Sequence, residues 1–185
     1  MPAPTTPSKT LIRLIDLAIV PAAILIFTKV ISILLLNAVL GLSWDVKTLS
    51  DAFFGVKVTY PDLDQLALVV SYSNLFMHLA ALTGTVLALS KLFYMHPQHI
   101  KPSLVLKLAK QDKLGFIQTS LHLYHEMIVW SLFLVISDIL ILINFTQNLT
   151  YDWVLGFSVI STLIVVFIMV RSIDRDLSVK SMRLK

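Results

Sequence analysis

The chain has 185 residues, of which 57% are hydrophobic and only 14% are charged, and its formal net charge is +4. This composition is too apolar for an ordinary soluble domain of this length. Because there is no cysteine, disulfides, thiolate metal sites and thiol catalysis are excluded within the chain.

Four long apolar stretches predict an all-α polytopic membrane protein, a bundle of four transmembrane helices. A helix needs roughly 20 apolar residues to cross the hydrocarbon core of a bilayer. We expect a disordered cytoplasmic N-terminus at 1–10, a transmembrane domain at 11–175 and a basic cytoplasmic tail at 176–185. The boundaries expected within the domain are spans at about 14–42, 66–95, 120–145 and 153–171, an outer loop at 43–65 and an inner connection at 96–119.

The first span holds one charged residue deep in its apolar stretch, Lys29. A charged group at that depth is costly unless it is paired or faces a cavity. In the outer loop, the alternating pattern of Val56–Tyr60 predicts a brief strand, and Thr48–Phe54 is expected to form a short surface helix. Either Asp62 or Asp64 is then in position to cap the second span.

The second span carries two rows of residues at helical spacing. Ala80, Gly84 and Ala88 form a row of small residues four positions apart, which lets another helix approach closely. A polar stripe runs beside this row and consists of Ser71, Asn74, His78 and Thr85. We therefore expect the second span to be the packing centre of the bundle.

The inner connection predicts an interfacial amphipathic helix, which opens at Pro102 and Ser103 and runs to about Lys113. Apolar residues fall on one side of it and lysines on the other, as suits the plane of the lipid headgroups.

Histidines flank this connection in two H-x-x-H pairs, and a glutamate follows the second pair: His96, His99, His122, His125 and Glu126. Imidazole and carboxylate groups hold metal ions without sulfur, and two histidines can ligate a haem. These residues are therefore a candidate metal or haem site. The alternative is a set of interfacial side chains that contact headgroups.

The third span carries Asp138, which has the opposite charge to Lys29 and lies at a reachable depth. We expect the two side chains to pair, with His78 at a similar depth. The three residues would form a proton relay or an ion path, or else a buried pair that fixes helix packing. The fourth span carries no charge and is expected to be a plain lipid-facing helix.

Basic residues gather before the first span, between the second and third, and after the fourth, whereas the other two connections together hold five aspartates and only two lysines. By the positive-inside rule both termini are cytoplasmic, in a plasma or inner membrane. The basic side chains then meet anionic lipid headgroups, so membrane lipids are expected partners and nucleic acid is not.

Catalytic signatures are missing from the sequence, which has no phosphate-binding glycine loop, no H-E-x-x-H and no serine elbow. The leading hypothesis is an integral membrane subunit or scaffold, with no catalysis and no cofactor of its own, that packs with other subunits or with copies of itself. One alternative is a histidine-ligated metal or haem redox protein. The other is a small channel or proton-coupled transporter.

Overall fold

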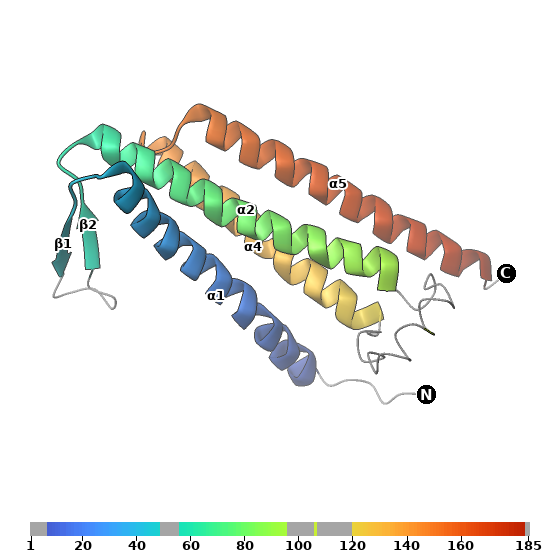
Figure 1. Cartoon of the computed structure of the whole chain (residues 1–185). Helices are drawn as coiled ribbons and strands as arrows, with labels where there is room; N and C mark the ends of the chain where they lie inside the picture. The colour runs from blue at the N-terminus through green and yellow to red at the C-terminus, as the bar shows by residue number, and fades with distance from the viewer. Residues whose placement is uncertain (1–6, 49–55, 96–105, 107–119, 184–185) are drawn as a thin grey trace.

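The structure, a computed structural model, describes residues 7–48, 56–95, 106 and 120–183 (Figure 1). Its elements, in chain order, are α1 (Pro7–Leu40), β1 (Asp45–Thr48), β2 (Val56–Thr59), α2 (Leu63–Met95), α4 (Ser120–Thr146) and α5 (Asp152–Arg183). All four of these helices are long and apolar enough to cross a membrane. The expected all-α fold with four transmembrane helices is therefore confirmed.

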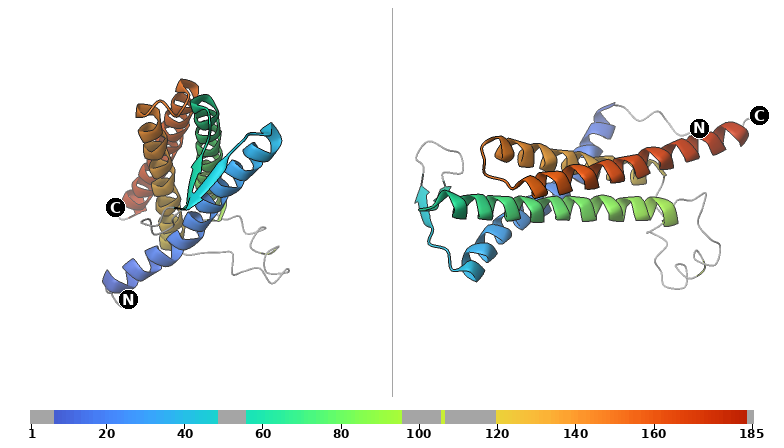
Figure 2. Two further views of the ribbon diagram at one scale, coloured as in Figure 1. Left: turned by 90° about the vertical axis from the view of Figure 1, so that its left-hand side faces the viewer. Right: turned by 90° about the horizontal axis from the view of Figure 1, so that it is seen from above.

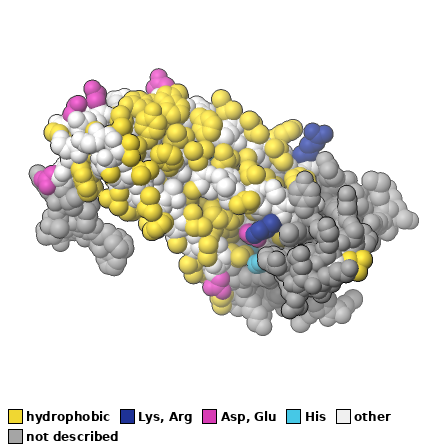
Figure 3. Space-filling model, in the orientation of Figure 1, with side chains coloured by type: hydrophobic (Ala, Val, Ile, Leu, Met, Phe, Trp, Pro, Cys, Tyr) yellow, Lys and Arg dark blue, Asp and Glu magenta, His cyan; other side chains and the backbone are white. Residues whose placement is uncertain are grey.

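The two ends of the bundle differ in what they carry. The strands β1 and β2 and the turn at 147–151 lie at one end, which we call the hairpin end, and both chain termini lie at the other, the terminal end (Figure 1). On the face drawn in Figure 3, most acidic side chains gather toward the hairpin end, and the Lys and Arg side chains lie toward the terminal end. A broad apolar surface covers the helices between them.

Backbone chemistry explains where the helices begin and end at the hairpin end. Asp62 caps α2, because its Oδ1 accepts the N–H of Asp64 at 3.2 Å. Gly41 adopts a φ of 59° directly after α1, and Asn148 a φ of 56° shortly after α4. Glycine and asparagine are the residues that best tolerate this left-handed conformation, which closes the last turn of a helix.

The element boundaries differ most from the expected ones at the start of the first helix and at the end of the last. The first helix begins at Pro7, inside the stretch expected to be disordered, and α5 continues to Arg183 through most of the expected tail. Proline is well suited to the first position of a helix, where its missing N–H is not needed. The helices therefore extend beyond the apolar stretches from which their boundaries were predicted.

The strand predicted near Val56 is confirmed, and it pairs with β1 in an antiparallel hairpin that matches Asp45 with Thr59 and Thr48 with Val56. The hairpin is tied to α1, since Asn37 Nδ2 donates to the Tyr60 hydroxyl at 2.9 Å. Most of the short helix expected at 48–54, and all of the interfacial helix expected at 102–113 except Leu106, lie outside the described residues.

Helix α2 is the centre of the bundle, because it packs most extensively against the other helices and is the most buried of the four. Helix α1 crosses the bundle obliquely and diverges from α4 and α5 (Figure 2). The apolar core is formed by side chains from all four helices: Leu25, Met77, Ala81, Ala88, Leu89, Leu92, Leu123, Met127, Leu134 and Val165.

Candidate functional site

The imidazole of His78, on α2, is fully buried where three helices meet. Its Nδ1 atom lies 2.9 Å from the hydroxyl of Ser137 on α4, and its Nε2 atom lies 2.9 Å from the hydroxyl of Ser161 on α5. The imidazole and the ring of Phe157 are T-shaped to one another, with centroids 6.2 Å apart. His78 therefore joins α2 to both α4 and α5 at membrane depth.

Asp138 completes this cluster from α4. Its Oδ1 atom lies 3.2 Å from Nδ1 of His78, which is ion-pair distance, although the atom forms no hydrogen bond with the residues the structure describes. The contact between the two residues is therefore one of charge, available whenever the imidazole is protonated.

The two serines that contact His78 also lie within hydrogen-bond distance of backbone carbonyls in their own helices. Ser137 donates its hydroxyl to the carbonyl of Leu134 at 2.7 Å, and Ser161 donates to the carbonyl of Ser158 at 3.0 Å. Each serine therefore links the imidazole of His78 to the backbone of its own helix, and the direction of each His78–serine hydrogen bond depends on the tautomer of the ring.

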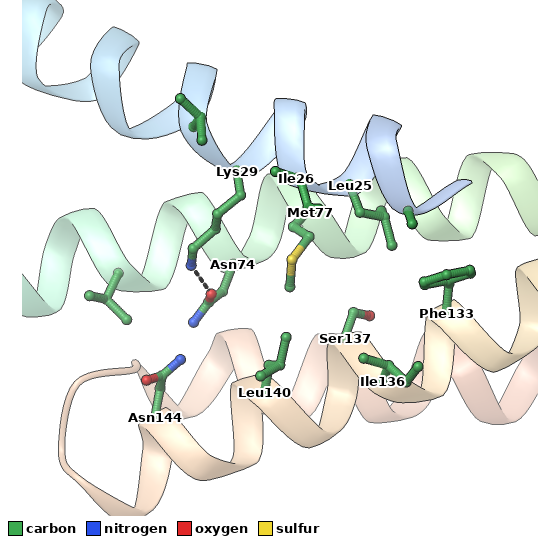
Figure 4. A pocket seen from close by; sticks show the side chains of 13 residues that line it. Leu25, Ile26, Lys29, Asn74, Met77, Phe133, Ile136, Ser137, Leu140 and Asn144 are labelled. Carbon is green, nitrogen blue, oxygen red and sulfur yellow. Dashed lines mark hydrogen bonds between the residues drawn. The ribbon is translucent and has the colours of Figure 1, made fainter. Parts of the chain in front are cut away.

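Lys29 and Asp138 have different partners, which corrects the expectation that they pair. The Lys29 ammonium of α1 donates to Oδ1 of Asn74 on α2 (Figure 4). The two charges do reach membrane depth on neighbouring helices. However, α4 presents the side chain of Asp138 to His78, and the lysine enters a separate pocket.

That pocket lies between α1, α2 and α4 and has a volume of about 510 Å³. Three polar lining residues, Lys29, Asn74 and Asn144, are nearer the hairpin end, and the hydroxyl of Ser137 lies farther along the pocket (Figure 4). The side chains farther from that end are mostly apolar and include Leu25, Ile26, Met77, Phe133 and Ile136. The pocket is thus amphipathic along the axis of the bundle.

The row of small residues on α2 meets an aromatic side chain from α4. A Cβ atom added to Gly84 would lie only 2.2 Å from Cε3 of Trp130, so the indole packs where a larger residue would have its side chain. Ala88 belongs to the apolar core and Ala80 packs against it. The three residues Ala80, Gly84 and Ala88 accordingly lie where α2 packs closely against its neighbours.

The polar stripe on α2 has several partners rather than one. Ser71 accepts the N–H of Tyr151 at 3.1 Å and donates to the carbonyl of Leu149 at 3.4 Å, so it binds the turn that joins α4 to α5. Thr85 donates to the carbonyl of Ala81 within its own helix at 2.8 Å. Among the described residues, charged side chains meet the stripe at its middle, where Lys29 contacts Asn74 and Asp138 contacts His78.

The histidine-rich group is described only in part, because His96 and His99 lie outside the described residues. His122 and His125 lie one turn apart on α4, both partly buried. Glu126 accepts a hydrogen bond from Lys91 at 2.5 Å, so this carboxylate already has a cationic partner. Within the described ranges no three potential metal ligands come together.

Sequence reasoning missed the serines that surround His78 and the partner of Lys29. Ser137 and Ser161 are single hydroxyls in apolar stretches, and such residues commonly bond to their own helix. Asn74 belongs to the polar stripe predicted on the second span, and the stripe by itself names no partner for it. The expectation that the fourth span is a plain lipid-facing helix was wrong, because α5 supplies Ser161 to the cluster.

Comparison with protein-family models, with curated proteins and with solved structures gave no match to this chain. A function therefore has to be argued from the residues of the chain itself.

Proposed function

We propose that this chain is an integral membrane subunit or scaffold, without catalysis of its own, whose helices pack within a larger membrane assembly. The proposal rests on the hydrogen bonds that polar side chains inside the membrane-spanning helices form with neighbouring helices. His78 bonds to hydroxyls on α4 and α5, and Lys29 on α1 bonds to Asn74 on α2. These bonds link all four helices, as polar side chains do when they serve helix association.

Packing on the terminal side of His78 supports the same proposal over a channel. There the described interior consists largely of buried apolar side chains, with the separate hydroxyls of Thr85, Ser131 and Ser172 among them; the apolar ones are Ala81, Ala88, Leu89, Leu92, Leu123 and Met127. An ion or proton path needs polar groups or water at successive depths. In the described part of the chain, Thr85 bonds to the carbonyl of Ala81 in its own helix and Ser131 to the sulfur of Met169, so these hydroxyls do not extend the His78 cluster.

Large apolar side chains on the outer faces of α1 and α5 supply the surface for partners or lipid. Phe27 is 66% exposed and Phe167 is 65% exposed in the single chain. The charge asymmetry of the sequence supports an orientation with both termini in the cytoplasm of a plasma or inner membrane. The partners we propose are membrane lipids and other membrane subunits or further copies of this chain.

A cysteine-scanning experiment tests the proposal cleanly, because the chain has no cysteine. Phe27→Cys and Phe167→Cys are treated in native membranes with a thiol-directed photocrosslinker, and the size of the assembly is measured after mild-detergent extraction. We expect a discrete adduct and a mass above that of one chain. Ser158→Cys, at a fully buried position, is the matched control and should give no adduct. A stable monomer without adducts would contradict the proposal.

A small proton-coupled transporter or channel is the second candidate, and the pairing of His78 with Asp138 at membrane depth favours it. An ionisable residue inside a membrane is a recognised marker of proton pathways. In reconstituted vesicles, Asp138→Asn should then abolish proton flux and leave the fold intact. If the variant instead fails to fold or assemble, the cluster serves structure.

A metal or haem role of the histidines has a direct test in the purified full-length protein. The scaffold proposal expects a colourless preparation without stoichiometric metal. A haem absorption band, or one metal ion per chain that is lost in His122→Ala, would replace the scaffold proposal with the redox one.

A further inference from the structure

The pocket between α1, α2 and α4 contains more hydrogen-bond donors than its own residues satisfy. Asn74 is only 1% exposed, its Oδ1 atom accepts from Lys29, and its Nδ2 atom has no partner among the described residues. In Figure 4 this nitrogen points away from Lys29, into the space between α2 and α4. A buried amide nitrogen without an acceptor is costly, so the site is complete only when an acceptor is bound.

Charge identifies the kind of acceptor. Lys29 contributes a cation to the pocket, and no carboxylate of the described chain forms an ion pair with it. Asp138, the acidic residue at comparable depth, lies beside His78 instead. A cation at membrane depth that faces a cavity calls for an anion, and one carboxylate can accept from both the ammonium and the free amide N–H.

The apolar part of the pocket indicates what is attached to that carboxylate. Beyond the polar lining, on the side away from the hairpin end, the walls are formed by Leu25, Ile26, Met77, Phe133 and Ile136. The volume of about 510 Å³ lies in the range of small-molecule sites, which is about 300–1,000 Å³. It suits one hydrocarbon chain with a small head.

The depth of Lys29 and Asn74 in the membrane favours a single-chain carboxylate over a phospholipid as the ligand. Lys29 is eleven residues from the end of α1 at Leu40, or about 16 Å along the helix at 1.5 Å per residue. Asn74 is likewise eleven residues from the start of α2 at Leu63. A phospholipid phosphate stays outside the hydrocarbon core, which is about 30 Å thick, whereas a single-chain carboxylate can reach the depth of Lys29 and direct its tail toward the terminal end.

We infer that this pocket binds a long-chain monocarboxylate from the membrane, such as a free fatty acid. Its carboxylate accepts hydrogen bonds from Lys29 and from Nδ2 of Asn74. Its hydrocarbon chain lies against Met77 and Phe133. The inference stands apart from the scaffold proposal, because it concerns a ligand of the single chain.

The test measures binding of radiolabelled palmitate to the full-length protein in nanodiscs of zwitterionic lipid. We expect saturable binding of one palmitate per chain, and at least tenfold weaker competition by hexadecanol, which has the same chain without the carboxylate. Lys29→Met should weaken binding at least tenfold. Lys91→Met, a control that removes a lysine outside the pocket, should leave it unchanged.

A second variant keeps the test decisive if Lys29→Met does not fold. Asn74→Asp puts a carboxylate beside Lys29, so the protein supplies its own anion and palmitate binding should fall at least tenfold. Equal competition by palmitate and hexadecanol would overturn the inference, as would unchanged binding in both variants. Displacement of palmitate by an anionic phospholipid or a neutral quinone at lower concentration would assign the pocket to that ligand instead.

Discussion

The Nδ1 atom of His78 lies 3.2 Å from Oδ1 of Asp138, and this contact joins the central helix α2 to α4 inside the membrane-spanning region. Ser137, the residue before Asp138, is bonded to the same ring nitrogen at 2.9 Å. Two consecutive residues of α4 therefore hold one histidine. Because buried polar groups are costly when unpaired, substitution of either His78 or Asp138 should destabilise the whole bundle.

We expect His78 and Asp138 to be energetically coupled. Single variants His78→Gln and Asp138→Asn should each lower the free energy of unfolding, and the double-mutant cycle should give a coupling of about 0.5–3 kcal/mol. The measurement is reversible unfolding of the purified protein in mixed micelles. Asp16→Asn, at an exposed position, serves as the control. Additive effects of the two substitutions would show that the contact carries no energy.

Gly84→Ala should destabilise the protein, although alanine normally favours a helix. The added Cβ would lie 2.2 Å from Cε3 of Trp130, and overpacking of this kind costs about 1–3 kcal/mol. Gly156→Ala is the matched control, because nothing lies within 4 Å of its added Cβ. That variant should be neutral or more stable by up to about 1 kcal/mol. Similar melting temperatures for the two variants would contradict close packing at Gly84.

Ser71→Ala should loosen the connection between α4 and α5. The substitution removes the acceptor of the Tyr151 N–H and the donor to the carbonyl of Leu149, and we expect a loss of about 1–3 kcal/mol in the free energy of unfolding. Hydrogen exchange at the Tyr151 amide should also become faster. Ser90→Ala, whose hydroxyl bonds only within its own helix, should change neither quantity. Unaltered exchange in Ser71→Ala would show that the turn does not need this serine.

Position 148 should tolerate glycine but not a β-branched residue such as valine. Its φ of 56° is left-handed, and this conformation costs other L-residues about 1–2 kcal/mol. We expect Asn148→Val to lower the free energy of unfolding by that amount, and Asn148→Gly to keep or slightly raise it. Thermal unfolding of the two variants measures the difference. Equal stabilities would mean that the turn relaxes to another conformation.

The sequence shows that Lys29 lies at membrane depth, but it does not show which residue the lysine contacts. Lys29 and Asp138 were recognisable as charges at membrane depth, because each interrupts a long apolar stretch. The direction in which each side chain points around its helix axis cannot be predicted from the sequence. The rotation of a helix and the angle at which it crosses its neighbours follow from how the helices pack. The oblique path of α1 takes Lys29 to Asn74, and the position of α4 places Asp138 beside His78.

The sequence by itself determined that four helices cross the membrane, that Asp62 or Asp64 caps the second, and that small residues line one face of it. These are local properties, decided by apolar length, capping chemistry and helical spacing. Only the tertiary structure decided that Trp130 occupies the space at Gly84, that serines from two helices hold His78, and that an amphipathic pocket forms around Lys29. Each of these depends on which helix faces meet, and that is settled by the packing of all four helices together.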